Sequence, residues 1–496
     1  MSESLQPVRV RFAPSPTGHM HLGSARTALY DYLLARRTGG RFILRIEDTD
    51  QKRTVPGAEE EVIQGLRWLG LEYDEGPDIG GSYAPYRQSE RREIYKEHAW
   101  MLVERGAAYP CFCLPDRLER VRREQQKAKL TPHYDGTCRR LDADGARQRA
   151  KNGGKFVIRF KTPQMGTTIA VDQLRGSISV ENRMLDDTIL LKSDGMPTYH
   201  LAAMVDDHLM GITHVIRGAE WLSTFPLHAL VVRAFDWQEP LWVHLSVFLK
   251  PSGKGKMSKR DTSIALDSGY SVYVMDLQKL GYIPEGVLNW IVLMGWGVAD
   301  DDVLTLKDMV EHFDIAHLNP APAAINFTKL DHFSGTHIRM LSVEDLAGRI
   351  KPYLVKAGYT VDDKKFLQIV PLIRQRLVTL DDCLPFAGFF FQETVKPLPE
   401  ELLGKDLTAA QSAEVTRCAY KILAGLLQIT PELAEPPMRA LVDQLGLSAN
   451  QVFGILRVAV TGQRVSPPLF ESMEVIGKQK VLERIQNAIG TLERMS

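Results

Sequence analysis

Near the N-terminus the chain runs Val8-Arg-Val-Arg-Phe-Ala-Pro-Ser-Pro-Thr-Gly-His-Met-His-Leu-Gly-Ser24. Apolar and charged residues alternate through Phe12, which predicts a β-strand, and the prolines and glycine that follow predict its end. From Leu22 onward, apolar residues recur at helical spacing. A strand that turns in this way into a helix presents backbone N–H groups and the positive helix end to a phosphate. The alternative interpretation of the segment is an ordinary turn with His21 as a capping residue.

The same alternation of strand and helix patterns continues along the chain. Residues 41–46 and 213–217 predict further strands, and residues 59–69 predict an amphipathic helix, so we expect crossover units and a parallel sheet. We predict an α/β fold with a Rossmann-type doubly wound parallel sheet, an inserted module and an all-helical C-terminal region. The expected boundaries are 1–108 and 191–250 for the two halves of the sheet domain, 109–190 for the inserted module, 251–330 for a connecting region and 331–496 for the helical region.

Composition excludes several classes of protein. The 496 residues are 44% hydrophobic and 25% charged, which is typical of a folded chain and not of a disordered one. Lysine plus arginine equals aspartate plus glutamate, at 61 each, which argues against a general polyanion binder. We see no membrane-spanning run and no export signal. Five cysteines are too few for a disulfide framework, so we expect a cytoplasmic protein.

A second motif, Lys256-Met-Ser-Lys-Arg260, follows a glycine-rich stretch. Its cations could close over a triphosphate and offset the charge that grows on departing pyrophosphate. Taken alone, such a motif is more commonly an exposed basic loop. The chain has neither a G-x-G-x-x-G fingerprint nor a Walker A loop, so the other common nucleotide sites lose support.

The two motifs together resemble the H-I-G-H and K-M-S-K-S signatures of class I aminoacyl-tRNA synthetases. The surrounding segments resemble the bacterial-type glutamyl-tRNA synthetase family over residues 8–335, through Arg11-Phe-Ala-Pro-Ser-Pro-Thr-Gly18, Arg45-Ile-Glu-Asp-Thr-Asp50 and Val205-Asp-Asp-His-Leu-Met-Gly211. The resemblance implies a glutamate–tRNA ligase that joins L-glutamate to tRNA(Glu) with ATP and Mg²⁺. It also implies a monomer whose inserted module holds the tRNA acceptor end and whose helical region binds the anticodon. The alternatives are a glutaminyl-tRNA synthetase of the same class and a tRNA-binding protein with an inactive site.

Matching motif positions assign the expected site residues. The resemblance implies catalytic roles for His21, Lys256 and Lys259. It places Arg11, Ser15, Glu47, Tyr199 and Arg217 on glutamate, and His21, Gly23, Glu220, Lys256, Ser258 and Lys259 on ATP. Two arginines suit a substrate with a side-chain carboxylate better than one with an amide. For either arginine alone, a surface ion pair is the commoner role.

Three thiols in the inserted module, Cys111, Cys113 and Cys138, suggest a tetrahedral zinc site. Many relatives place a fourth ligand where this chain has Arg140, which cannot bind zinc. His133, Tyr134, Asp142 or a water could supply the missing ligand, or the module could have lost its metal. The anticodon-contacting residues stay open; Arg374, Arg376 and Arg457 are candidates only as cations on helical segments.

Overall fold

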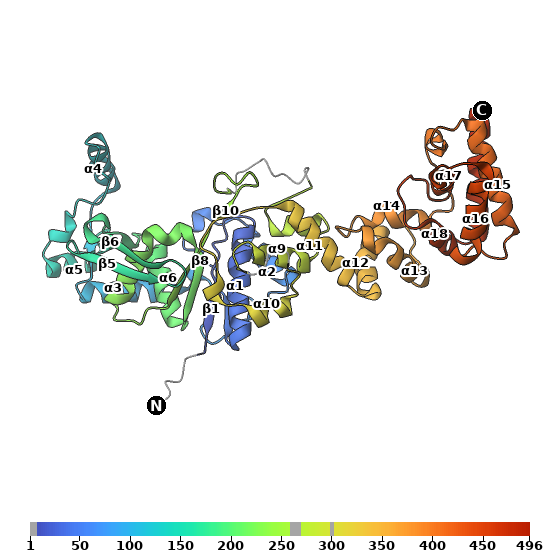
Figure 1. Ribbon diagram of the computed structural model, residues 1–496. Coiled ribbons are helices and arrows are strands. Elements are labelled where there is room, and N and C mark those ends of the chain that lie inside the picture. The colour runs from blue at the N-terminus through green and yellow to red at the C-terminus, as the bar shows by residue number, and fades with distance from the viewer. Residues whose placement is uncertain (1–6, 258–268, 298–301) are drawn as a thin grey trace. The chain divides into compact units, whose positions relative to one another are not determined.

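The computed structural model describes residues 7–257, 269–297 and 302–496 (Figure 1). The chain divides into two compact units. The first consists of residues 1–279 and 287–327, and the second of residues 280–286 and 328–496. Ser258 and Lys259 of the second motif lie outside the described residues.

Two pairs of parallel strands form the centre of the first unit. They are β1 (Arg9–Phe12) with β2 (Arg41–Leu44), and β8 (His214–Gly218) with β9 (Leu241–Leu245). The pairs meet where the amide of Thr213 donates to the carbonyl of Arg9 at 2.9 Å. The order of the strands is therefore β2, β1, β8 and β9. This confirms the predicted Rossmann-type parallel arrangement.

Helices of the first unit connect and cover these strands (Figure 1). The predicted helix after the N-terminal turn is α1 (Leu22–Thr38), which ends at Gly39 in the left-handed conformation at φ 66°. The predicted amphipathic helix is α2 (Ala58–Trp68). The other helices of this part are α3 (Arg92–Glu104), α6 (Tyr199–Leu209), α7 (Phe225–Ala234), α8 (Val274–Lys279), α9 (Pro284–Leu293) and α10 (Leu306–His312). Two short strands, β10 (Phe248–Leu249) and β11 (Ala323–Ala324), pair in parallel.

Residues 109–190 carry strands of a different kind. An antiparallel sheet has the order β3 (Ala108–Cys111), β4 (Val157–Phe160) and β7 (Ile189–Leu191), with helices α4 (Pro115–Lys127) and α5 (Ala143–Lys151) nearby in sequence. The hairpin of β5 (Thr167–Asp172) and β6 (Gly176–Glu181) instead joins the parallel strands, because Asp172 pairs with Trp242 of β9. Part of the inserted stretch therefore extends the sheet that carries the site.

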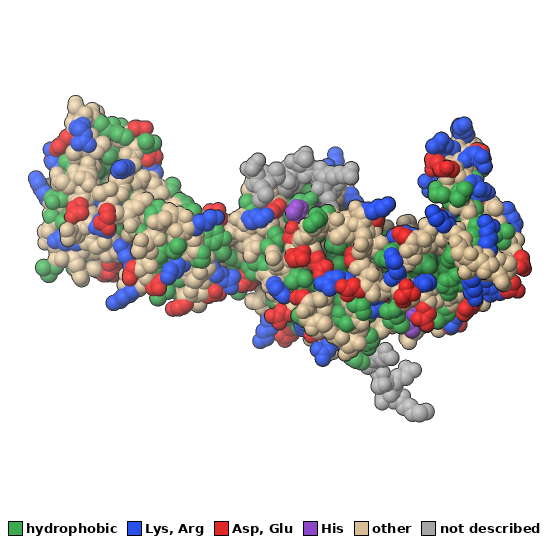
Figure 2. Space-filling model, turned by 180° about the vertical axis from the view of Figure 1, so that it is seen from behind, with side chains coloured by type: hydrophobic (Ala, Val, Ile, Leu, Met, Phe, Trp, Pro, Cys, Tyr) green, Lys and Arg blue, Asp and Glu red, His purple; other side chains and the backbone are tan. Residues whose placement is uncertain are grey.

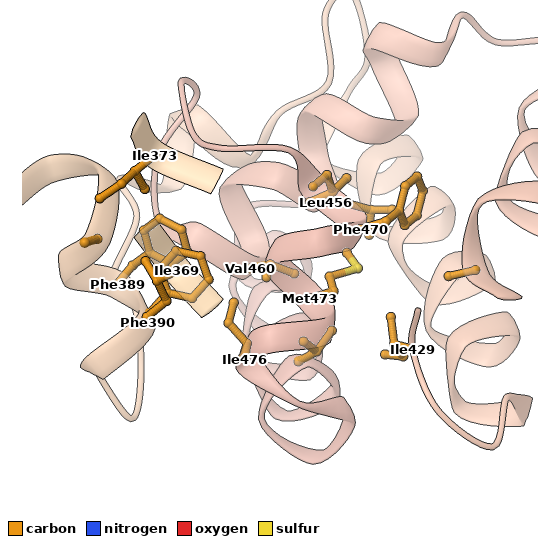
Figure 3. Close-up of a cluster of buried hydrophobic side chains, with 14 of the residues drawn as sticks. Ile369, Ile373, Phe389, Phe390, Ile429, Leu456, Val460, Phe470, Met473 and Ile476 are labelled. Carbon is orange, nitrogen blue, oxygen red and sulfur yellow. The ribbon is translucent and has the colours of Figure 1, made fainter. Parts of the chain in front are cut away.

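Residues 331–496 of the second unit form helices joined by turns and carry no strand, as the sequence predicts. Its helices are α11 (Phe327–Met340), α12 (Val343–Lys356), α13 (Asp363–Ile373), α14 (Cys383–Ala387), α15 (Ala409–Gly425), α16 (Pro431–Leu445), α17 (Ala449–Thr461), α18 (Leu469–Ile476) and α19 (Lys478–Met495). Reciprocal capping boxes start α15 at Thr408 and α17 at Ser448. Figure 3 shows part of the buried core, where Phe389 and Phe390 lie near Ile369 and Ile476.

Surface charge agrees with the balanced composition. Figure 2 shows lysine and arginine side chains interspersed with aspartate and glutamate over the visible face. Among the described residues, no helix is long and apolar enough to span a lipid bilayer.

Candidate active site

A cleft of about 1150 Å³ opens at the carboxyl ends of β1 and β8. Open α/β sheets bind their ligands at such an edge. The structure brings nearly all the predicted residues together around this one cleft. Its lining includes Arg11, Ser15, His21, Gly23, Glu47, Tyr199, Arg217, Glu220 and Lys256.

The start of α1 forms one part of the cleft. His21 is the N-cap residue, and its Nδ1 accepts the amide of Gly23 at 3.1 Å. In the neutral ring the proton therefore lies on Nε2, which can donate to an anion. The turn is held by residues 272–274, because the amide of Leu22 donates to the carbonyl of Val272 and that of Val274 donates to the carbonyl of Met20. This segment combines a fixed N–H donor with a positive helix end, which suits a phosphate.

Gly23 leaves space at the helix start. Of the atoms that the structure describes, a Cβ added there would meet only Nδ1 of His21, at 3.6 Å. The chain's own packing therefore does not require a glycine at this position. Space for a ligand beside the backbone fits the expected role of Gly23.

Arg11, on β1, lines the cleft, but its side chain already forms hydrogen bonds within the protein. Its Nε donates to Oδ1 of Asp207 at 2.9 Å, and its Nη1 donates to the carbonyl of Ile216 at 3.2 Å. Burial disfavours the guanidinium charge, but the adjacent Asp207 outweighs it and raises the pKa of Arg11. Arg11 therefore has a carboxylate partner before any substrate arrives.

Asp207 belongs to an acidic pair on α6 that the sequence analysis did not assign to the site. It also accepts from Nη1 of Arg45 at 2.8 Å, while its neighbour Asp206 accepts from Arg91 and Tyr95 at 2.8 Å. Both aspartates are buried. The signal was present in the sequence, since two adjacent acids interrupt an otherwise apolar helical pattern at positions that face inward.

Glu47 and Tyr199 lie beside these arginines. Oε1 of Glu47 accepts from Nη2 of Arg45 at 3.0 Å, and burial raises the pKa of this carboxyl. Tyr199 stacks on Trp221 with ring centroids 3.9 Å apart. These residues offer a carboxylate and a hydroxyl, which can bind a substrate ammonium group.

Arg217, on β8, has different neighbours from those of Arg11. Its Nε donates to Nε2 of His244 at 2.9 Å, its Nη2 contacts Nδ1 of His228 at 3.0 Å, and its Nη1 lies 3.4 Å from the hydroxyl of Tyr199. Among the described residues, no carboxylate lies within ion-pair distance of this guanidinium. Burial lowers the pKa of Arg217, because a charge is disfavoured away from water. Neither histidine was predicted from the sequence.

Comparison with known proteins places this geometry in a family. Residues 7–332 match the model of the class I tRNA synthetase catalytic domain for E and Q, and residues 345–489 match an anticodon binding domain. The glutamate–tRNA ligase of Roseiflexus sp. (strain RS-1) is 42% identical, over 99% of this chain and 98% of that protein. The chain belongs to the class I glutamate–tRNA ligase family. The predicted resemblance is thereby confirmed.

Two further members support this assignment. The glutamate–tRNA ligase of Chloroflexus aurantiacus is 40% identical over the full length of both chains. The crystal structure of a glutamate tRNA ligase from Elizabethkingia meningosepticum, in complex with its amino acid, superimposes with a TM-score of 0.90 at 36% identity. It covers 98% of this chain and all of that one. The comparisons favour the glutamate interpretation over the glutaminyl alternative.

The synthetase also brings the three thiols of the inserted module together. Cys111, Cys113 and Cys138 place their sulfur atoms within 4.8 Å of one another. The hydroxyl of Tyr134 lies 3.4 Å from both Cys111 Sγ and Cys113 Sγ. The other two candidate side chains have different contacts: Asp142 caps α5, and His133 lies beside the carbonyl of Thr131. Arg140, which cannot bind zinc, lies beside the carbonyl of Asp135.

In the helical unit of the synthetase, the three candidate cations have partners within the fold. Nη1 of Arg457 donates to Oγ of Ser466 at 2.7 Å, Arg376 lies over the ring of Phe386, and Arg374 donates to the carbonyl of Leu341. Their assignment to the anticodon stays a prediction.

Proposed function

We propose that this synthetase is a glutamate–tRNA ligase, which activates L-glutamate with ATP and transfers it to the 3′ end of tRNA(Glu). One observation carries the proposal. A single cleft is lined both by the start of α1, which suits phosphate, and by Arg217, a buried cation whose charge suits a carboxylate.

The reaction needs no covalent enzyme intermediate. The α-carboxylate of glutamate attacks the α-phosphorus of ATP and releases pyrophosphate, and a terminal ribose hydroxyl of tRNA then attacks the carbonyl of the adenylate and releases AMP. Nε2–H of His21, the positive end of α1 and the ammonium of Lys256 stabilise the phosphate charge. Ser258 and Lys259 take the same role from the family signature. Glutamate binds with its side-chain carboxylate on Arg217 and Tyr199, and Arg11, Ser15 and Glu47 complete the pocket.

Mg²⁺ fits the phosphate part of the cleft. This ion usually keeps several waters and is held through substrate phosphates and one or two carboxylates. Glu220 lines the cleft, and its charge acts on Arg26 of α1, so a carboxylate is available beside the start of that helix. When bound, Mg²⁺ would neutralise part of the phosphate charge.

Zinc fits the inserted module, with Tyr134 as the fourth ligand. Bonds of about 2.3 Å in a tetrahedron put sulfur atoms about 3.8 Å apart, and Cys113 and Cys138 already lie at 3.5 Å. Zinc supplies a structural cross-link there. We expect about one zinc per chain in protein purified without a metal-binding tag, and weaker retention against a chelator in Tyr134→Phe. His133→Ala serves as the matched control; equal loss in both variants, or metal-free wild type, contradicts the assignment.

The decisive experiment measures ATP–pyrophosphate exchange with glutamate and with glutamine, each with and without total bacterial tRNA. We expect exchange with glutamate in the presence of tRNA. Exchange with glutamine instead indicates the rival specificity, and none under any condition indicates an inactive tRNA-binding protein. We further propose that the enzyme is a cytoplasmic monomer, which gel filtration and cell fractionation test.

A further inference from the structure

Two histidines hold Arg217 at the end of β8. Both are fully buried, His244 on β9 and His228 on α7. A guanidinium has only donors, so the ring nitrogens that face Arg217 must be unprotonated acceptors. His244 therefore accepts at Nε2 and His228 accepts at Nδ1, over 2.9 and 3.0 Å.

The opposite side of each ring fixes this arrangement. Nδ1 of His244 donates to Oδ2 of Asp172 at 2.7 Å, and Nε2 of His228 donates to Nδ1 of His200 at 2.9 Å. Burial lowers the pKa of His244 and of His228, and Arg217 adds to the effect, while the bond to Asp172 opposes it at His244. Because each ring accepts from Arg217, each is neutral and has one proton, whose place is set by a second partner.

Neutral partners matter for what Arg217 can bind. The histidines orient the guanidinium through Nε and Nη2 without offsetting its charge. Arg217 carries five donor hydrogens and its contacts with described residues use three, which leaves one N–H on Nη1 and one on Nη2 for a ligand. Donors on both terminal nitrogens suit the two oxygens of a carboxylate, whereas the NH₂ of an amide would face a donor.

We infer that His228 and His244 are positioning residues that hold Arg217 as a charged clamp, and that they thereby set the preference for glutamate over glutamine. The inference rests on the proposed function, since it takes the side-chain carboxylate of glutamate as the ligand of Arg217.

Amide variants of His228 provide a test in which only the place of the acceptor changes. In His228→Asn the side-chain oxygen takes the place of Nδ1 and can accept from Arg217. In His228→Gln the oxygen falls one bond further out, at the place of Nε2. His228→Leu removes the acceptor altogether. Each variant is assayed with wild type for the KM and kcat of exchange with glutamate, for the KM of ATP, and for the kcat/KM ratio of glutamate over glutamine.

We expect His228→Leu and His228→Gln to raise the KM for glutamate about tenfold or more and to lower the selectivity ratio, with the KM for ATP nearly unchanged. His228→Asn should stay within about threefold of wild type. A merely structural role predicts instead that all three variants lose activity in step with thermal stability. If His228→Leu does not fold, the Asn and Gln variants still decide the question.

Equal behaviour of the Asn and Gln variants overturns the inference, as does an unchanged glutamate KM in His228→Gln. Failure of the wild type to exchange with glutamate is a different result, because it overturns the proposed function. The pair His244→Gln and His244→Leu repeats the test on β9, where the Gln oxygen takes the place of Nε2. We expect Gln to preserve function in place of His244 and Asn to preserve it in place of His228. This result would show that Arg217 is held by Nε2 of His244 and by Nδ1 of His228.

Discussion

Arg11 at the end of β1 and Arg217 at the end of β8 line the same cleft, yet only the charge of Arg11 has a carboxylate partner among the described residues. Both are buried, with 3% and 5% of their surfaces exposed. Arg11 lies against Asp207, and its pKa is raised, whereas Arg217 lies against two neutral histidines, and its pKa is lowered. Burial alone therefore does not decide whether an arginine supports the fold or binds substrate. We expect the charge of its partner to decide it.

The difference has an energetic reason. A buried charge with a carboxylate partner is stabilised within the chain, and losing that partner is costly. A buried charge without one keeps its attraction for an incoming anion. We therefore expect Arg11 to contribute more to the stability of the fold, and Arg217 to contribute more to the binding of the substrate carboxylate.

The largest effect that this comparison predicts is on stability, at Asp207. Replacing it in Asp207→Ala leaves Arg11 and Arg45 buried without this shared carboxylate, so we expect a loss of about 3–5 kcal/mol in the free energy of unfolding. Urea unfolding followed by tryptophan fluorescence measures it. All seven tryptophans belong to the first unit: Trp68, Trp100, Trp221, Trp237, Trp242, Trp290 and Trp296.

Glu119→Ala is the matched control for that experiment. Glu119 of α4 also pairs with an arginine, Arg123 at 3.2 Å, but its side chain is 49% exposed and that of Arg123 is 71% exposed. Exposed pairs contribute little, so we expect almost no change. If the two variants are destabilised equally, the buried carboxylate of Asp207 has no special importance for the stability of the fold.

The next effect is on binding, at Arg217. In Arg217→Gln the charge is lost while the amide can still donate to one histidine, so we expect a rise of about a hundredfold in the KM for glutamate and reduced discrimination against glutamine. Its free energy of unfolding should fall far less than that of Asp207→Ala, because no carboxylate loses its partner. If Arg217→Gln is strongly destabilised but keeps its affinity for glutamate, then Arg217 supports the fold and does not bind the substrate.

A third and smaller effect depends on pH and tests a buried carboxyl on the β1 side of the cleft. Asp31 of α1 is fully buried, and within the described part of the chain neither of its carboxylate oxygens has a hydrogen-bond partner. Burial raises its pKa well above the usual value; Arg11 opposes the shift and Asp207 adds to it. The folded state then holds a proton that the unfolded state releases above about pH 4, so this group lowers stability as pH rises from there toward its folded pKa.

Asp31→Asn removes that titration. We expect the variant to match wild type near pH 4 and to gain relative stability with rising pH, by at most about 1.4 kcal/mol per pH unit. Urea midpoints at several pH values test this. A stability difference that stays constant from pH 4 to pH 8 means that the carboxyl of Asp31 titrates normally.

Sequence patterns predicted the elements of this site better than its pairings. Alternation and helical spacing located β1, α1 and β8, because these are local consequences of burying one face. The partner of Arg11 lies 196 residues away on α6, and nothing local in either segment specifies that contact. Tertiary folding likewise brings the hydroxyl of Tyr134 beside the thiol cluster, and nothing local in the sequence distinguishes Tyr134 from the other possible fourth ligands. The prediction that Arg11 and Arg217 both line the glutamate pocket came from motif positions, which carry no information about neighbouring charge.

The smallest effect concerns the one contact through which Arg217 meets another part of the pocket. The hydroxyl of Tyr199 lies 3.4 Å from Nη1, at the long end of hydrogen-bond distances, while its ring stacks on Trp221. Tyr199→Phe keeps the stack and removes only the hydroxyl, so we expect the KM for glutamate to rise about two- to fivefold with unfolding unchanged. Steady-state exchange at saturating ATP measures it. A rise as large as that in Arg217→Gln would show that the hydroxyl, rather than the uncompensated charge, holds the carboxylate, and the contrast between the two arginines would then say little about how the substrate is bound.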